Sequence, residues 1–216
     1  MMALTPTVFI VDDDASVRKA LARLFRAVGL AVETYTGADD LLARVPAGAH
    51  GCLLLDIKMP KTSGLELQQR LDGFGIHMPV IFLTAHADVP GTVRAMKAGA
   101  LEVITKPFQD AALLDAVHQA IARDAVRRRS LRDYQDLRER YETLTSRERA
   151  VMAHVVTGKL NKEAAWLMGT SEKTVKAQRA RVMRKMSASS LPDLVRMADR
   201  LGLFPGDSAP REVPLH

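Results

Sequence analysis

The chain has 216 residues, of which 47% are hydrophobic and 26% charged, so it can build one large or two small globular domains. Its single cysteine, Cys52, excludes a disulfide scaffold and a cysteine-rich zinc module, and favours a reducing, cytoplasmic location. No apolar run approaches the roughly 18 residues that a membrane span needs. The first residues also lack the pattern of a secretory signal. We therefore expect a cytoplasmic protein with no membrane partner.

Positive charge is unevenly distributed along the chain. Residues 1–123 carry 12 Lys and Arg against 13 Asp and Glu, whereas residues 143–204 carry 12 against 5. Between them, residues 124–142 are close to neutral, and so is the tail, 205–216, which we expect to be disordered. This asymmetry predicts a polyanionic partner for residues 143–204 alone.

The first half of the chain alternates short apolar runs with helical patterns. The apolar runs are expected to be strands, at residues 8–11, 31–35, 52–55, 79–83 and 102–105. Apolar residues at helical spacing follow each run, at 15–27, 39–45, 64–71 and 89–98, and from residue 110 onward. The runs do not alternate with polar residues, as is typical of strands that are covered on both faces. The pattern predicts an α/β domain with a doubly wound, five-stranded parallel sheet.

Polar residues stand where these strands end. In an open parallel sheet, the functional site lies at the carboxyl ends of the strands. The residues at that position are Asp12, Asp13, Asp56, Thr84 and Lys106. The sequence therefore predicts that three carboxylates, a hydroxyl group and an ammonium group gather at one edge of the sheet.

Residues 124–142 are dense in charge and contain no Gly or Pro, which predicts a helical linker. Within and just after them, Tyr134, Leu137, Tyr141 and Leu144 follow a 3-4-3 spacing, which covers about two heptads. Two interpretations stay open. The segment is either a solvated linker helix or a helix that pairs with a second copy in a dimer.

Residues 143–204 are expected to form a small all-helical domain. A capping box at Thr145 begins its first helix, and Asn161 is expected to cap a short second helix. A turn at Gly169 leads to a longer helix that Ser171 caps, and Ser190 caps the last helix. Helix, tight turn with Gly and helix is typical of a helix-turn-helix module.

Residues 1–123 resemble a two-component receiver domain. The resemblance rests on Asp12 and Asp13 after the first apolar run, on the sequence DIKMP at 56–60, on Thr84 and on KPF at 106–108. It implies that Asp56 accepts a phosphoryl group from a sensor histidine kinase. It also implies that Lys106 and Thr84 contact that phosphoryl group.

The same resemblance implies a divalent metal, Mg²⁺ or Mn²⁺, at this edge of the sheet. Its oxygen ligands would come from the side chains of three residues and the backbone carbonyl of a fourth, with the first acting largely through water: Asp12, Asp13, Asp56 and Lys58. The peptide bond before Pro107 is expected to be cis. Val103 stands where receiver domains often have an aromatic residue that reports phosphorylation, which puts that half of the switch in doubt.

Residues 143–204 resemble the DNA-binding domain of the LuxR/FixJ type. The matching stretches are LTSRE at 144–148, NK at 161–162, TVK at 174–176 and MRKM at 183–186. The resemblance implies binding to double-stranded promoter DNA. It also implies a homodimer that forms on phosphorylation through residues 89–105, and it leaves RNA polymerase open as a further partner.

The helix at 172–186 has two faces of different character. Val175, Val182 and Met186 share one face by their spacing, which predicts the side that packs on the core. The opposite stripe has only basic and very small side chains: Lys173, Lys176, Ala177, Ala180, Arg181 and Arg184. Alanines let a helix approach base edges, while Lys and Arg reach guanine or phosphate. By resemblance, Lys162 and Thr174 contact phosphate.

These features predict a response regulator rather than an enzyme. A phosphohydrolase with an aspartyl-phosphate intermediate needs a second acidic residue two positions after its nucleophile, where this chain has Lys58. A constitutive DNA-binding protein, in which the receiver domain only dimerises, is the remaining alternative. Phosphate-dependent DNA affinity separates it from the main hypothesis.

Overall fold

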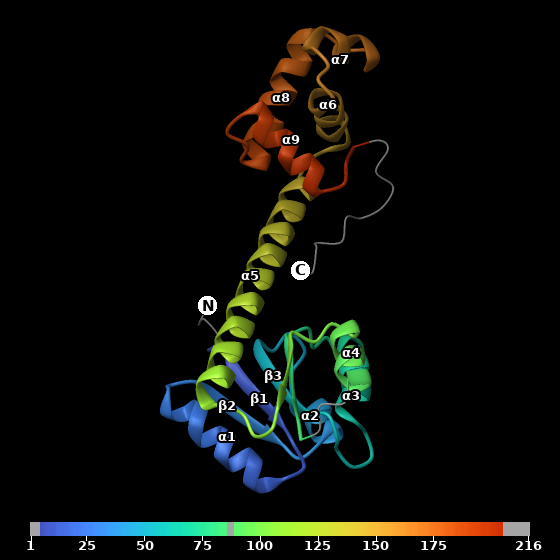
Figure 1. The fold of residues 1–216 in the computed structure, drawn as a ribbon. Coiled ribbons are helices and arrows are strands. Elements are labelled where there is room, and N and C mark those ends of the chain that lie inside the picture. The colour runs from blue at the N-terminus through green and yellow to red at the C-terminus, as the bar shows by residue number, and fades with distance from the viewer. Residues whose placement is uncertain (1–4, 86–88, 205–216) are drawn as a thin grey trace. The chain divides into compact units, whose positions relative to one another are not determined.

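The computed structural model describes residues 5–85 and 89–204, so the expected disordered tail, 205–216, lies outside the described residues. The chain divides into two compact units, Met1–Arg128 and Arg129–His216. The first unit alternates strands and helices, and the second is helical (Figure 1).

A five-stranded parallel sheet forms the centre of the first unit. Its strands lie in the order β2-β1-β3-β4-β5, and every neighbouring pair is parallel. The bounds are β1 (Thr7–Val11), β2 (Ala31–Tyr35), β3 (Gly51–Asp56), β4 (Val80–Thr84) and β5 (Glu102–Thr105). The five-stranded parallel sheet that the sequence predicts is confirmed.

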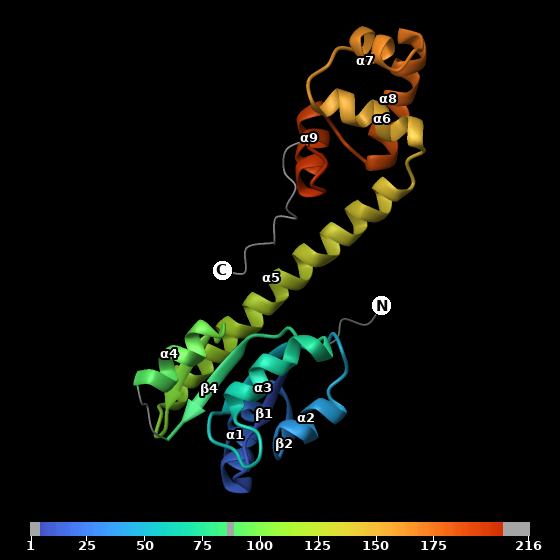
Figure 2. The same cartoon turned by 90° about the vertical axis from the view of Figure 1, so that its right-hand side faces the viewer.

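Helices cover both faces of this sheet (Figures 1 and 2). On one face, Ile10 and Leu54 pack against helix α1 (Ala15–Ala27) and the first part of helix α5 (Asp110–Glu142). On the other face, strand residues such as Leu55 pack against three helices: α2 (Ala38–Arg44), α3 (Gly64–Leu71) and α4 (Val89–Lys97). A single 3₁₀ turn, Asp72–Phe74, follows α3. The doubly wound architecture follows because successive strand side chains point to opposite faces.

At their carboxyl ends, two strands extend one residue further than their apolar runs. Asp56 is paired in register with Leu83, and Thr84 with Thr105, so both polar residues belong to the ends of their strands. Hydrogen bonding in the sheet, which hydrophobicity does not record, accounts for the difference. Helices α2 and α4 likewise differ by one residue from the expected ranges 39–45 and 89–98.

A buried carboxylate holds the middle of α5 on the first unit. The Asp124 side chain is 2% exposed, accepts a hydrogen bond from the backbone N–H of Gly51 at 3.0 Å, and pairs with Arg127 at 3.0 Å. Arg128 lies 3.9 Å from the same carboxylate and donates two hydrogen bonds to the carbonyl oxygen of Gly48, at 2.9 and 2.7 Å. The sequence did not reveal this anchor because its partners are far apart in the chain.

Gly51 begins β3 in a conformation that only glycine adopts without strain. Its φ is +133°, and a Cβ atom there would lie 1.9 Å from the backbone oxygen of Thr7 on β1. The neighbouring Cys52 is fully buried, and this burial, with a smaller effect from the charge of Asp124, raises the pKa of its thiol to about 12. The amino end of β3 is therefore closely packed.

Up to residue 204, the second unit consists of the end of α5 and four helices: α6 (Ser146–Val156), α7 (Asn161–Leu167), α8 (Glu172–Met186) and α9 (Leu191–Arg200). Their core includes Val151, Val175 and Val182, and also Leu137 and Leu144 from the expected linker stripe. The range 124–142 is thus divided, because Asp124 packs in the first unit and Leu137 in the second. Within the described ranges, no helix is long and apolar enough to cross a membrane.

Capping residues set most of the helix starts in this unit as predicted. Thr145 forms a capping box with Glu148, and Ser171 and Ser190 each accept a backbone N–H in the first turn of their helices. The expected cap at Asn161 is wrong: Leu160 occupies the cap position, where its N–H donates to the carboxylate of Glu163 at 2.7 Å. The Asn161 side chain instead accepts from Arg179 on α8 at 3.2 Å.

Candidate functional site

The acidic site lies at the carboxyl edge of the sheet. Asp12 directly follows β1, Asp56 ends β3, Thr84 ends β4 and Lys106 directly follows β5. β1, β3, β4 and β5 are consecutive in the sheet, which brings these four residues to one edge. Three of them are buried, with Asp12 2%, Thr84 2% and Asp56 7% exposed.

Lys106 joins the two buried carboxylates. Its Nζ atom lies 2.8 Å from an oxygen of Asp12 and 2.8 Å from an oxygen of Asp56. The peptide bond that follows Lys106 is cis, as expected, and the Lys106 N–H donates to the carbonyl oxygen of Thr84 at 2.7 Å. One ammonium group therefore sits between the two acids, held by the ends of β4 and β5.

Backbone groups hold the second oxygen of each carboxylate. Asp56 accepts from the N–H of Lys58 at 2.8 Å, and Asp12 accepts from the N–H of Asp14 at 2.8 Å. The guanidinium group of Arg18 also donates to the carbonyl oxygen of Asp12 at 2.6 Å. Sequence reasoning missed Arg18, whose charge on an exposed helix turn carries no signal of this contact.

The pKa values of Asp56 and Lys106 are both raised, for different reasons. Burial raises the pKa of Asp56, and the hydrogen bond and charge of Lys106 oppose this shift without cancelling it. For Lys106, burial favours the neutral amine, but the bonds to Asp12 and Asp56 outweigh it and raise the pKa. A desolvated carboxylate of raised pKa is a stronger base, and hence a better nucleophile, than one in water.

The oxygen-rich edge suits a hard divalent cation. Mg²⁺ prefers carboxylate and carbonyl oxygens, which Asp12, Asp56 and the backbone of Lys58 offer here, and Asp13 adds a carboxylate beside them in the chain. Three carboxylates against the one ammonium group of Lys106 leave a negative site. Asp13 itself is exposed, and over residues 5–85 and 89–204 no three His, Cys, Asp or Glu side chains converge as a metal cluster. The donor set therefore fits a metal in kind, while the structure joins only Asp12 and Asp56.

The loop after β3 depends on Gly64 for its path. A Cβ atom at Gly64 would lie 2.3 Å from the carbonyl oxygen of Asp56, and the Gly64 N–H donates to the carbonyl oxygen of Ile57 at 3.0 Å. The start of α3 therefore lies directly against the backbone of Asp56.

We expect Gly64→Ala to displace the backbone of Asp56, and so to slow phosphoryl transfer from acetyl phosphate to the chain about tenfold or more, because misplacement by 1 Å can cost a factor of 100 in rate. Time-resolved intact mass measures the rate. Gly73→Ala is the matched control, since a Cβ atom at Gly73 meets open space. An unchanged rate in Gly64→Ala would contradict this account of the loop.

Val103 fills the position where receiver domains often have an aromatic residue. It lies on β5 in register with Phe82 and packs against the core beneath α4 as a partly buried residue. A valine has no large ring to move between an inward and an outward position. The exposed edge of β5 therefore lacks an aromatic reporter at this place.

The second candidate site is the exposed stripe of α8, the helix that Figure 1 labels in the second unit. Val175, Val182 and Met186 are buried in the core of the second unit, which places the opposite side of the helix in solvent. The six expected stripe residues are all exposed: Lys173, Lys176, Ala177, Ala180, Arg181 and Arg184. The helix therefore presents a strip of basic side chains, with the two small alanine side chains at its centre.

Neighbouring groups hold α8 and its surroundings in place. Lys176 pairs with Glu172 one turn earlier at 3.0 Å, and both side chains are exposed. At the other end of the helix, Lys185 donates to the carboxylate of Glu148 at 2.7 Å, which lowers the pKa of Glu148. Lys162 is exposed in the first turn of α7, and Thr174 is partly buried in the first turn of α8.

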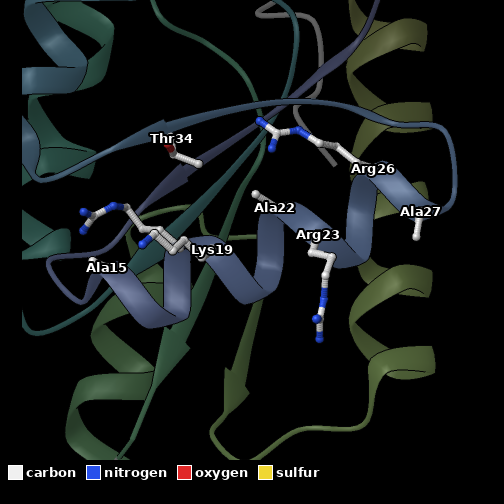
Figure 3. Close-up of a pocket in the computed structure, with 8 residues that line it drawn as sticks. Ala15, Lys19, Ala22, Arg23, Arg26, Ala27 and Thr34 are labelled. Atoms are coloured by element: carbon white, nitrogen blue, oxygen red, sulfur yellow. The ribbon is translucent and has the colours of Figure 1, made fainter.

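A cavity of about 660 Å³ is lined by none of the four residues at the acidic edge, Asp12, Asp56, Thr84 and Lys106. It runs along α1 and reaches Thr34 of β2, with four basic side chains around it. Arg23 and Arg26 leave the helix in different directions, so these cations do not converge on one point (Figure 3). Convergence of charge, rather than cavity size, distinguishes the acidic edge as the functional site.

Comparisons with known proteins find a matching family for each of the two units. The response regulator receiver domain family matches residues 8–118, and the luxR family of bacterial regulatory proteins matches residues 142–198. Nodulation protein W of Bradyrhizobium diazoefficiens is 47% identical over 196 residues, which cover 91% of this chain and 86% of that protein. The transcriptional regulatory protein FixJ of Azorhizobium caulinodans is 45% identical over 203 residues, covering 94% and 96%.

A solved structure shows the same similarity over both units. The low-resolution structure of the response regulator StyR has a TM-score of 0.83 and 43% identity, and the match covers 91% of this chain and 99% of that one. With the sheet, the acidic edge and the helical unit in place, the chain belongs to the two-component response regulators that join a receiver domain to a LuxR-type DNA-binding domain and regulate transcription.

Proposed function

We propose that phosphorylation of Asp56 by a sensor histidine kinase controls dimerisation and sequence-specific DNA binding by this chain. One observation carries the proposal: Asp56 is a desolvated carboxylate at the end of β3, held 2.8 Å from the ammonium group of Lys106. Phosphoryl transfer depends mainly on positioning and on neutralising charge, and this arrangement supplies both. Transfer to an internal side chain makes the protein a regulator and not an enzyme that releases a product.

In the proposed reaction, a carboxylate oxygen of Asp56 attacks the phosphorus atom of a phosphohistidine on the kinase. The new P–O bond forms as the P–N bond breaks, and the histidine leaves with the electron pair of that bond. Lys106 pairs with one phosphoryl oxygen, and the hydroxyl group of Thr84 donates to another. The N–H of Lys58 holds the remaining carboxylate oxygen of Asp56 in place.

A Mg²⁺ or Mn²⁺ ion would be held by Asp13, by Asp56 and by the carbonyl oxygen of Lys58, with Asp12 acting through water. When bound, the ion neutralises the negative charge that the phosphoryl group brings to the carboxylates. Lys106 already neutralises part of the charge of Asp12 and Asp56.

For the second unit, we propose that α8 lies in the major groove of promoter DNA. Ala177 and Ala180 let the helix approach base edges and thymine methyl groups, and the flanking Lys and Arg residues reach guanine or phosphate. Lys162 and Thr174, each in the first turn of a helix, contact phosphate groups. The face around 89–105 forms the dimer, which lets two such helices reach two half-sites. RNA polymerase is a further proposed partner, and the proposed location is cytoplasmic.

The test uses the full chain before and after incubation with acetyl phosphate and Mg²⁺. Intact mass is expected to rise by one phosphoryl group, native mass to shift from monomer to dimer, and affinity for target duplex DNA to increase. Linking two modules in a dimer raises affinity without any new contact. Equal DNA affinity in both states would instead support the alternative, a constitutive DNA-binding protein.

The centre of the stripe gives the sharpest test of DNA readout. Ala177→Glu is expected to weaken specific binding by at least about 1–3 kcal/mol, because a bulky acid replaces a methyl group at the groove. Lys176→Ala is expected to weaken binding to a similar extent and to change sequence preference. Arg196→Ala, which removes an exposed cation of α9, is the control and is expected to bind normally. Intact operator binding by Ala177→Glu would place α8 outside the major groove.

A further inference from the structure

Trp166, the only tryptophan of the chain, is a highly exposed residue of α7. The residue is 82% exposed, and its indole N–H makes no hydrogen bond to another described residue. Tryptophan is enriched where a surface becomes buried on binding, because its ring covers a large area and its N–H finds a partner. An exposed ring with a free donor therefore indicates a surface that a partner covers.

The position of Trp166 connects it to the proposed DNA-binding stripe. Lys162 and Trp166 are four residues apart on α7, so they lie on the same side of that helix. The start of α7 is joined to α8 by the hydrogen bond between Asn161 and Arg179. Arg179 and Lys176 are three residues apart and so share a side of α8. The first turn of α7, which carries Lys162, is therefore held next to α8, and Trp166 follows one turn later on the side of α7 that Lys162 occupies.

The charge around Trp166 favours a polyanion over a protein partner. Residues 143–204 carry 12 Lys and Arg against 5 Asp and Glu, and Lys159 and Lys162 precede Trp166 on the exposed surface. The carboxylate of Glu163, the acidic residue of α7, accepts a hydrogen bond from the N–H of Leu160. A phosphate oxygen is the natural acceptor for an indole N–H beside a lysine.

We propose that Trp166 binds the sugar–phosphate backbone of DNA next to the phosphate that Lys162 contacts. Its N–H donates to a phosphate oxygen, and its ring covers the adjoining deoxyribose. This inference rests on the proposed DNA-binding function and extends it, because it adds the second turn of α7 to the surface that contacts the DNA backbone. Such a contact positions α8 in the groove and does not itself read sequence.

A backbone contact can be tested without knowing the operator, since it forms on any duplex. The phosphorylated full chain is titrated with a short mixed-sequence DNA duplex over a series of salt concentrations. Because Trp166 is the sole tryptophan, its emission is expected to change on binding. Trp166→Ala is expected to weaken binding about tenfold, through the lost hydrogen bond and ring contact.

Two variants separate this contact from a simple charge effect. Lys162→Ala is expected to lower the salt dependence of binding by about one unit, whereas Trp166→Ala removes no charge and leaves that slope unchanged. Trp166→Phe keeps a ring and loses the N–H, so its affinity is expected to lie between those of the wild type and Trp166→Ala. Both residues, Lys162 and Trp166, are exposed, and circular dichroism checks that the fold of each variant is retained.

Leu167→Ala is the matched control, because Leu167 is also exposed on α7 but has no donor and turns to another side of the helix. It is expected to bind DNA normally.

If Trp166→Ala bound DNA as the wild type does while Lys162→Ala and Ala177→Glu bound it more weakly, the inference would be overturned and the DNA-binding function would stand. Loss of transcription in both Trp166→Ala and Leu167→Ala at normal DNA affinity would mark a protein-docking surface instead. If DNA affinity were unchanged in Trp166→Ala, in Lys162→Ala and in Ala177→Glu alike, the proposed function itself would fail.

Discussion

Asp56→Asn is expected to abolish phosphoryl uptake from acetyl phosphate and from the partner kinase. The carboxamide has nearly the shape of the carboxylate, but it is not a nucleophile that forms an acyl phosphate. The fold is expected to be at least as stable as the wild type at neutral pH. Burial raises the pKa of Asp56, which means that the folded state disfavours its charge, and asparagine removes that cost.

Intact mass spectrometry after incubation with acetyl phosphate and Mg²⁺ measures this outcome. Asp39→Asn, which alters an exposed carboxylate on α2, is expected to gain one phosphoryl group as the wild type does. The same gain in Asp56→Asn would assign the acceptor to another residue. DNA affinity of Asp56→Asn is expected to stay at the unphosphorylated level in every condition.

Asp124→Ala is expected to destabilise the first unit by about 3 kcal/mol or more, because it leaves Arg127 and the N–H of Gly51 without their buried partner. The loss is large against the total stability of a domain. Urea unfolding followed by circular dichroism measures it. Asp124→Asn keeps an acceptor for Gly51 and loses only the charge pairing, so an intermediate loss is expected.

Asp115→Ala is the control on the same helix, since the Asp115 side chain is exposed. Its effect is expected to remain within about 0.5 kcal/mol, as for most surface substitutions. Equal stability of Asp115→Ala and Asp124→Ala would show that the Asp124 contacts do not hold α5 on the sheet.

Local patterns predict the architecture well because they record which side chains are buried. Apolar runs without alternation predicted all five strands, and the polar residues that follow four of these runs predicted where the functional edge lies. Strand ends were less certain: hydrogen bonding carries Asp56 and Thr84 into β3 and β4. The prediction that Asn161 caps α7 was wrong because its side chain accepts a hydrogen bond from Arg179 on α8 instead.

Contacts between distant parts of the chain had no local signal. Lys106 lies 94 residues from Asp12 and 50 from Asp56, and its bridging position follows only once the sheet is assembled. Asp124 and Gly51 are 73 residues apart, and nothing near either one indicates the other. In the same way, Leu137 belongs to a regular stripe, yet it packs with helices that come later in the chain.

The reactivity of Cys52 reports how often the central sheet opens. A thiolate is the form that reacts, and a fully buried thiol with a pKa of about 12 is shielded from any reagent at neutral pH. Alkylation of the wild-type chain therefore proceeds only during the moments when β3 separates from its neighbours, and its rate counts those openings. Since β3 also ends in Asp56, any ligand or modification that stabilises the closed sheet slows alkylation, and the logarithm of the alkylation rate falls in proportion to the free energy that it adds.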